Sequence, residues 1–375
     1  MISQLMKTGQ FDADSIKQFA VNYVSTMAFI LLGYWFYTTF SGFHIQHFAH
    51  NWRPAYGQNM LDIFIYTRGF WRGFVVVFAV ALVPYFLIEE KGLSKAALSW
   101  SGAAKALFPR LGAVSVEEHQ AMLASALKFF FVPFILDAFI AHVAAVNYRT
   151  ADLIRWVLLP EFDRSLFIKD FPQFLCGLAL AYIYFFDIVP FVVGYLVDSE
   201  RLGSKIKSVE NTWRGWFFCL ICYPPFNSAF GNFFTTHYDE YVKPFDGLLY
   251  AGGLHTALNI GALFLLALYA SVSVSLGAKA SNLTSRGIVT TGLFQYVRHP
   301  AYAAKNGAWW LFSIGAAIHT YRAGGNWLYP LIALVFWTWV YYNRAITEEQ
   351  HLLRTDPEYE FYMGQVKCRF IPKVF

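Results

Sequence analysis

The sequence predicts an all-α protein that crosses a membrane several times. Hydrophobic residues make up 57% of the 375 residues, whereas charged residues make up only 14%. Soluble globular proteins carry about 25% charged residues, so this deficit indicates a membrane protein. The chain also contains several apolar runs of roughly 20 residues, the length that a helix needs to cross a bilayer. These observations predict a polytopic transmembrane helical protein with about eight spanning helices.

The positions of the spans follow from hydropathy. The third contains Asp137 and His142, and the fifth contains Pro224 and Pro225. The N-terminal segment lacks the basic, apolar and small-residue order of a cleavable signal peptide, so the first apolar helix is expected to direct insertion. The polar segment 89–127 is expected to form short amphipathic helices at the surface. The eight expected spans cover approximately residues 18–40, 69–88, 128–147, 172–197, 213–231, 248–276, 301–319 and 327–343.

Lysine and arginine residues predict a multi-pass protein with both termini in the cytoplasm. Cytoplasmic loops of membrane proteins are enriched in these residues. The opposite loops, 41–60 and 232–247, hold one basic residue each, and the mixed loop 148–170 departs from the pattern. The net charge of +5 is spread along the loops, which does not suit nucleic acid. The basic segments that share one side are 89–127, 200–214, 278–298 and the tail after residue 343.

A polar cluster lies in GLFQYVRHPAYAAKN, residues 292–306, immediately before an apolar run. Pro300 suits the first turn of a helix and favours an extended conformation at the preceding residue. Arg298 and His299 are therefore expected at a helix N-terminus, where unpaired N–H groups and the helix dipole attract an anion. The alternative is that Arg298 reaches lipid phosphates while His299 caps the helix.

A second polar cluster follows the last apolar run, in RAITEE at residues 344–349. Arg344 and Glu348 are four residues apart, so they share one face of a helix. The acidic pair Glu348 and Glu349 is unfavourable beside anionic headgroups and suits a nearby cation, although a solvated helix end is the alternative.

Together the two clusters predict a pocket, at the cytosolic end of the C-terminal helices, for a ligand that carries both an anion and a cation. S-adenosylmethionine is such a ligand. Its carboxylate would suit Arg298 and the helix N-terminus. Its amino group and sulfonium would suit the glutamates and the aromatic faces of Tyr296 and Tyr302.

The two clusters resemble the integral-membrane methyltransferases related to isoprenylcysteine carboxyl methyltransferase and the phospholipid N-methyltransferases. The family pattern is approximately LG…LVTTGPYRYVRHPxYxG, which LGAKASNLTSRGIVTTGLFQYVRHPAYAAKN resembles. The downstream pattern is approximately RxxxEExxL…EYxxYxxxVxxxIP. The resemblance covers residues 275–372, and its downstream part is carried by Arg344, Glu348, Glu349, Leu352, Glu358, Tyr359, Tyr362, Val366, Ile371 and Pro372.

The resemblance implies a methyltransferase that takes S-adenosylmethionine from the cytosol and a lipid or lipidated acceptor from the membrane. It divides the chain into an N-terminal transmembrane region, 1–210, with a possible lipid-substrate cavity, and a methyltransferase-like module, 211–375. The cofactor-binding residues that it implies, together with the neighbouring ring of Tyr296, are Arg298, His299, Pro300, Tyr302, Glu348 and Glu349.

The acceptor decides whether a base is needed. A carboxylate is already a nucleophile, whereas an amine must lose a proton. His255 is the first candidate catalytic base, because its helix leads directly into the cofactor motif, and Arg344 is the second candidate catalytic residue. Other ionisable groups within the expected spans are Asp137, His142 and Asp187.

Two further patterns are expected to be structural. His44, His47 and His50 are spaced by three residues, which spreads them over roughly a third of a helix circumference. Cys219 and Cys222 form a CxxC within an apolar run and lack a second Cys or His pair. We therefore expect no metal site.

Two alternative functions are consistent with parts of the pattern. A sterol-reductase-like NADPH enzyme would share an Arg-His pair, but its family has a tryptophan-rich stretch before the pair and Asn-Tyr-Gly-Asp after it. A non-catalytic binding protein would retain a degenerate pocket. Leu293 and Gln295 stand where the methyltransferase pattern has proline and arginine, which keeps this alternative open.

Overall fold

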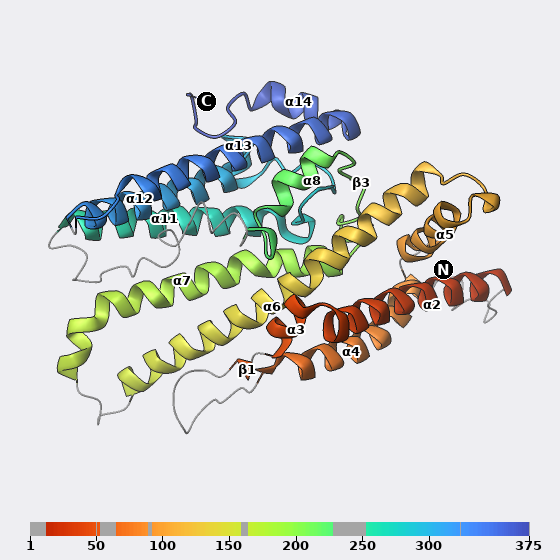
Figure 1. Ribbon diagram of the computed structural model, residues 1–375, viewed down its shortest axis with the longest axis horizontal. Coiled ribbons are helices and arrows are strands. Elements are labelled where there is room, and N and C mark those ends of the chain that lie inside the picture. Colours follow the sequence, from red (N-terminus) through yellow and green to blue (C-terminus); the bar gives the residue numbers. More distant parts are fainter. Residues whose placement is uncertain are drawn as a thin grey trace.

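Long helices dominate the computed structural model, in three layers (Figure 1). The central layer pairs α6 (Val116–Leu158) with α7 (Arg164–Leu196). One flank contains α2 (Ala13–Trp35) and α4 (Thr67–Ile88), and the other contains α11 (Gly253–Leu276), α12 (Pro300–Arg322) and α13 (Leu328–Thr355). The structure describes residues 13–49, 51–52, 65–88, 92–158, 164–227, 253–322 and 324–374.

Short elements connect these layers. The described residues form two antiparallel two-residue ladders: β1 (Asn51–Trp52) pairs with β2 (Ile65–Tyr66), and β3 (Ser208–Val209) pairs with β4 (Thr284–Ser285). In the second ladder Ser208 lies opposite Ser285, so it joins the central layer to the start of the C-terminal motif. The short helices are η1 (Phe36–Phe40, a π-helix), α3 (Gly42–Ala49), α5 (Lys95–Leu107), η2 (Pro109–Leu111), α8 (Trp213–Leu220), η3 (Gly277–Lys279), η4 (Gly292–Gln295) and α14 (Pro357–Gln365).

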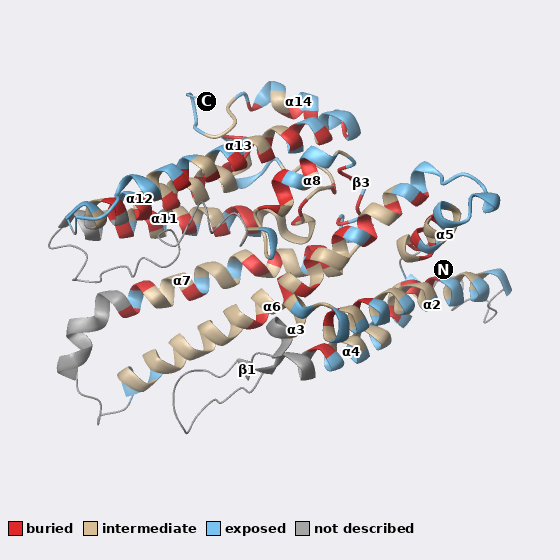
Figure 2. Cartoon of the chain, in the orientation of Figure 1, coloured by how far each residue is buried: buried red, intermediate tan, exposed pale blue. Residues whose placement is uncertain are grey.

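The predicted all-α membrane class is confirmed. Among the described residues, 5 helices are long and apolar enough to cross a membrane, and they lie in α2–η1, α4, α6, α7 and α11. Their apolar side chains face outward in part: Val76, Val77 and Val80 on α4 are 64–69% exposed. Figure 2 shows buried residues gathered where α6 and α7 meet β3 and α8.

The expected count of eight spans is not reproduced by these helices. α12 and α13 form where two further spans were expected, but both helices are more polar than the five apolar helices named above. The expected span 213–231 is different: α8 ends at Leu220 after 8 residues, about 12 Å of helix, too short to cross a bilayer. Phe218 and Cys219 are buried inside the protein instead, and the chain then turns.

Local sequence explains the start and the middle of α6. Ser115 and Glu118 form a capping box: the Ser115 N–H donates to Glu118 (2.9 Å) and the Glu118 N–H donates to Ser115 Oγ (3.1 Å). Further along, Pro133 lacks the N–H that would bond the Phe129 carbonyl. The Tyr37 hydroxyl, from η1, donates to that carbonyl instead. The helix therefore continues through its proline with this carbonyl satisfied.

α7 packs closely against the segment that follows α11. Gly194, near the end of α7, lies against the backbone of η3 and Ala280. A Cβ atom at Gly194 would overlap the Ala280 carbonyl group. This glycine is needed for close approach rather than for an unusual backbone angle.

Gly194→Ala is therefore expected to lower the free energy of unfolding by about 1–3 kcal/mol, because backbone would have to move to admit the methyl group. Thermal unfolding of the purified protein measures the change. Gly73→Ala on α4 is the matched control, since no atom lies within 4 Å of the added Cβ there. Equal stability of the two variants would contradict the close packing of α7 against η3.

Candidate functional site

The C-terminal segment folds back onto the start of α12. The backbone N–H groups of Arg298 and His299 donate to the carbonyls of Cys368 (3.0 Å) and Arg369 (2.9 Å). The helix N-terminus that was expected to attract an anion is thus partly satisfied by the chain itself. Pro300 begins α12, as the sequence predicts. This docking fixes the position of the His299 ring.

A buried ion cluster holds the docked segment in place. Glu349 is 4% exposed, and its carboxylate accepts hydrogen bonds from Arg298 Nε (2.7 Å) and from Arg369 Nη2 (2.7 Å). Arg298 Nη1 also donates to the carbonyl oxygens of Val366 (2.9 Å) and Lys367 (2.6 Å). Arg298 and Glu349 therefore bind each other and the C-terminal segment. Their contacts indicate that this pair holds the C-terminal segment against the start of α12.

His299, Tyr302 and Glu348 form a second group of contacting side chains, next to this ion cluster. The rings of His299 and Tyr302 stack with centroids 5.4 Å apart and an interplanar angle of 6°. The Tyr302 hydroxyl donates to Glu348 (2.7 Å), and His299 Nε2 lies 3.2 Å from Glu349. The Glu348 side chain is 47% exposed, in contrast to that of Glu349. Glu348 is thus the carboxylate of this pair that a ligand can reach.

Arg344, on α13, is buried close to Tyr302. Its guanidinium carbon lies 5.2–5.8 Å from the ring centroids of Tyr302, Tyr223 and Tyr341. Arg344 Nη2 donates to Asn282 Oδ1 (2.5 Å), and the Asn282 side chain is held in turn by the Tyr195 hydroxyl (2.8 Å). Within the described part of the chain, no Asp or Glu carboxylate lies within 4.0 Å of this guanidinium. A buried cation that lacks a counter-ion is costly and favours an anionic ligand.

These residues line one end of a cavity of about 360 Å³. The part of the lining that comes from α6 and α7 is mainly apolar and includes Phe134, Ile135 and Phe191; we refer to it as the apolar end. Two ionisable residues that the sequence placed inside spans, His142 and Asp187, also reach this cavity. The cavity thus joins a charged end to an apolar end.

The structure brings most of the expected site residues together. Arg298, His299, Pro300, Tyr302, Glu348 and Arg344 all line the cavity. Tyr296 is 58% exposed and lies outside the lining, and Glu349 lies behind it. His255 belongs to α11, but its side chain is outside the described residues.

The sequence did not single out several lining residues. Asn282, Tyr223 and Tyr341 hold Arg344, and Lys305 lies over the rings of Tyr269 (5.5 Å) and Trp309 (5.0 Å). A tyrosine or asparagine in an apolar context gives no local signal. Only the packing of α12, α13 and the segments that follow α8 and η3 shows that these residues converge.

The cysteine and histidine patterns show no ligand-like arrangement in the described residues. Cys219 and Cys222 both line the cavity as free thiols. His44 Nδ1 lies 2.7 Å from Ser41 Oγ. The side chains of His47 and His50 are outside the described residues.

Comparison with known proteins finds one family match that covers most of both motif blocks. Residues 263–366 match the model of a family described as a protein of unknown function, DUF1295. This segment includes the Arg-His-Pro motif as well as Arg344, Glu348 and Glu349. No curated protein and no solved structure matches the chain.

Proposed function

We propose that this membrane protein transfers a methyl group from S-adenosylmethionine to a lipid or lipid-linked acceptor. The proposal makes it a relative of the isoprenylcysteine carboxyl methyltransferases and the phospholipid N-methyltransferases. One observation supports it most strongly: the buried guanidinium of Arg344 and the accessible carboxylate of Glu348 line the same cavity. A ligand with both an anion and a cation would complement both groups.

The anion site is Arg344. A guanidinium can bind a carboxylate through two parallel N–H donors, and its low exposure strengthens that bond. Asn282 and the three tyrosine rings fix the plane of the guanidinium before the ligand arrives. We infer that Arg344, rather than Arg298, binds the carboxylate of the methyl donor, since Arg298 is already bonded to Glu349 and the C-terminal segment.

The cation site is Glu348 with the stacked rings of His299 and Tyr302. Glu348 would bind an ammonium group, and the ring faces would stabilise a positively charged sulfur. The cavity volume of about 360 Å³ lies in the range of about 300–1,000 Å³ that holds drug-sized ligands. The residues present therefore fit this donor.

S-adenosylmethionine would supply a methyl group bound to a sulfonium: the acceptor's electron pair would form the new bond to the methyl carbon while the carbon–sulfur bond breaks, and the neutral thioether would leave with that bond's electron pair. The chain's contribution is to hold donor and acceptor in line and to exclude water. The apolar end between α6 and α7 would admit the acyl or prenyl chain of the acceptor. For an amine acceptor, His142 or Asp187 would accept the released proton, and a carboxylate acceptor would need no base.

The positive loops favour a topology with the cavity and both termini on the cytosolic side. In this arrangement the donor enters from the cytosol and the acceptor from the bilayer. The N-terminal region, 1–210, supplies the α6 and α7 wall of the apolar end.

A binding titration on the detergent-purified full chain tests the proposal. S-adenosylmethionine and its demethylated product should each bind saturably, whereas NADPH should not. Incubation with methyl-labelled donor and a lipid extract should transfer label to a lipid. Tight NADPH binding without a response to either sulfur compound would favour a reductase. Saturable donor binding without transfer would indicate a binding protein.

A further inference from the structure

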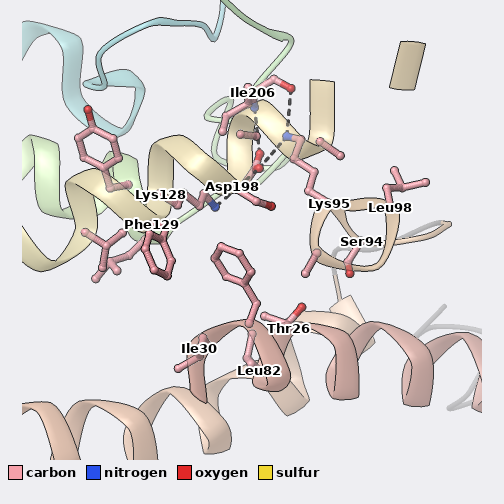
Figure 3. A pocket seen from close by; sticks show the side chains of 18 of the residues that line it. Thr26, Ile30, Leu82, Ser94, Lys95, Leu98, Lys128, Phe129, Asp198 and Ile206 are labelled. Carbon is pink, nitrogen blue, oxygen red and sulfur yellow. Dashed lines mark hydrogen bonds and ion pairs between the residues drawn. The ribbon is translucent and has the colours of Figure 1, made fainter. Parts of the chain in front are cut away.

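A second and larger cavity lies in the N-terminal half of the chain. Its volume is about 470 Å³, and its walls come from α2, α4, α5, α6 and the segment 195–209 (Figure 3). No residue of this cavity belongs to the motifs described above. We refer to it as the N-terminal cavity.

Most of the N-terminal cavity is apolar. Phe29 and Ile30 of α2, Phe78 and Leu82 of α4, and Phe129 and Val132 of α6 line it. The lining of α2 and α4 belongs to helices that are apolar enough to span the membrane. An apolar cavity at this position suits a hydrocarbon chain.

One end of the N-terminal cavity is charged. Lys95 Nζ lies 2.7 Å and Lys128 Nζ lies 3.9 Å from the same carboxylate oxygen of Asp198. The three side chains are 30%, 27% and 12% exposed. Figure 3 shows Lys95 and Asp198 on one side of the cavity, and Ile30 and Leu82 on the opposite side. Among the residues that the structure describes, two ammonium groups therefore flank one carboxylate at this end.

Burial adds to the demand for an anion. It lowers the pKa of the Lys95 ammonium, although Asp198 opposes that change. The described lining residues include four lysines and three acids: Lys95, Lys128, Lys205, Lys207, Glu117, Asp198 and Glu200.

We propose that the N-terminal cavity binds a single-chain amphiphile with an anionic head, a carboxylate or a phosphate. The head would lie between Lys95 and Lys128, and the chain would extend along Phe129 toward Ile30 and Leu82. The volume suits one chain rather than the two of a phospholipid. This site does not depend on methyl transfer, because the lining residues of the two cavities do not overlap.

Binding of palmitate to the full chain in zwitterionic nanodiscs tests the proposal. Palmitate should bind saturably, and hexadecanol, which has the same chain without the charge, should bind at least about tenfold more weakly. Lysophosphatidate with the same chain distinguishes the two possible heads, since the tighter of the two ligands identifies the preferred anion. Equal binding of palmitate and hexadecanol would overturn the proposal.

Charge variants give effects of opposite sign. Lys95→Gln and Lys128→Gln should each weaken palmitate binding by about 10- to 100-fold and leave hexadecanol binding unchanged. Asp198→Asn should tighten palmitate binding several-fold, because it removes the competing carboxylate. Lys17→Gln is the matched control, since Lys17 is exposed on α2. Unchanged palmitate affinity in both lysine variants would also overturn the proposal.

A palmitate that carries a diazirine on its chain locates the site without relying on the variants. Photolysis should label residues of α2, α4 and α6 that line the N-terminal cavity, and excess palmitate should suppress the labelling. Labels restricted to outward-facing residues such as Val76 and Val80 would show binding at the protein surface only, which contradicts the proposal.

Discussion

Arg344→Gln should weaken binding of S-adenosylmethionine by about 30-fold or more, equivalent to roughly 2 kcal/mol or more. The substitution removes the guanidinium proposed to bind the donor carboxylate. It should also leave the thermal stability of the unliganded protein unchanged or raise it, because a buried charge without a nearby carboxylate is lost. Calorimetric titration and thermal unfolding of the same preparation measure the two effects.

Two variants sharpen this test. Arg344→Lys keeps the charge but loses the planar donor pair and the contact with the tyrosine rings, so it should remain weak. Arg322→Gln makes the same change at an exposed position near the end of α12 and should alter neither quantity. A fall in unliganded stability with unchanged donor affinity would show that Arg344 is structural.

Glu349→Gln, in contrast to Arg344→Gln, should act mainly by lowering the stability of the unliganded protein. Loss of this carboxylate leaves Arg298 and Arg369 without their shared anion, which should lower the free energy of unfolding by about 3–5 kcal/mol. A thiol-reactive dye can follow unfolding, because Cys176 and Cys219 are free and buried. Glu360→Gln is the control, since Glu360 is exposed on α14.

The effect of Glu349→Gln should depend on pH. Burial alone would raise the pKa of the Glu349 carboxyl, but hydrogen bonds from His299, Arg369 and Arg298 hold it well below its ordinary value. A depressed pKa stabilises the fold fully above the unfolded value of about 4.3 and loses that effect as the pH falls toward the folded value. The stability difference should be constant from about pH 7 to 5 and shrink in stronger acid. A difference that grows in acid would contradict this assignment.

Hydropathy predicted the long helices because length and composition decide them. α6, α7 and α11 each contain an apolar stretch that only a membrane or a large core can cover. The same criterion failed at 213–231, because hydropathy does not separate residues that face lipid from residues buried in protein. Phe218 and Ile221 pack against α13 and α12 in a protein core. The turn at Ile221 ends α8 before the paired prolines.

Sequence reasoning placed the two polar clusters in one pocket, and the structure brings them into contact. It did not separate the roles of Arg298 and Arg344, since both arginines lie beside apolar runs. The distinction comes from the C-terminal segment, whose carbonyls at Val366 and Lys367 bind Arg298 across more than 60 residues of sequence. Contacts of this range depend on how the chain folds back, which local patterns do not show.

α6 is one continuous helix that contributes lining residues to both cavities. Lys128 and Val132 face the N-terminal cavity, whereas Ile135 and Ala138, one to two turns later, face the candidate site. Pro133, where the helix lacks one of its own hydrogen bonds, lies between the two sets. A bend at Pro133 would alter the shape of both cavities. An amphiphile in the N-terminal cavity would therefore change the apparent Kd of the methyl donor in the candidate site. Thermodynamic reciprocity requires the donor to change the amphiphile's affinity by the same factor. Lipid that remains bound after purification would therefore alter the donor Kd measured in a titration.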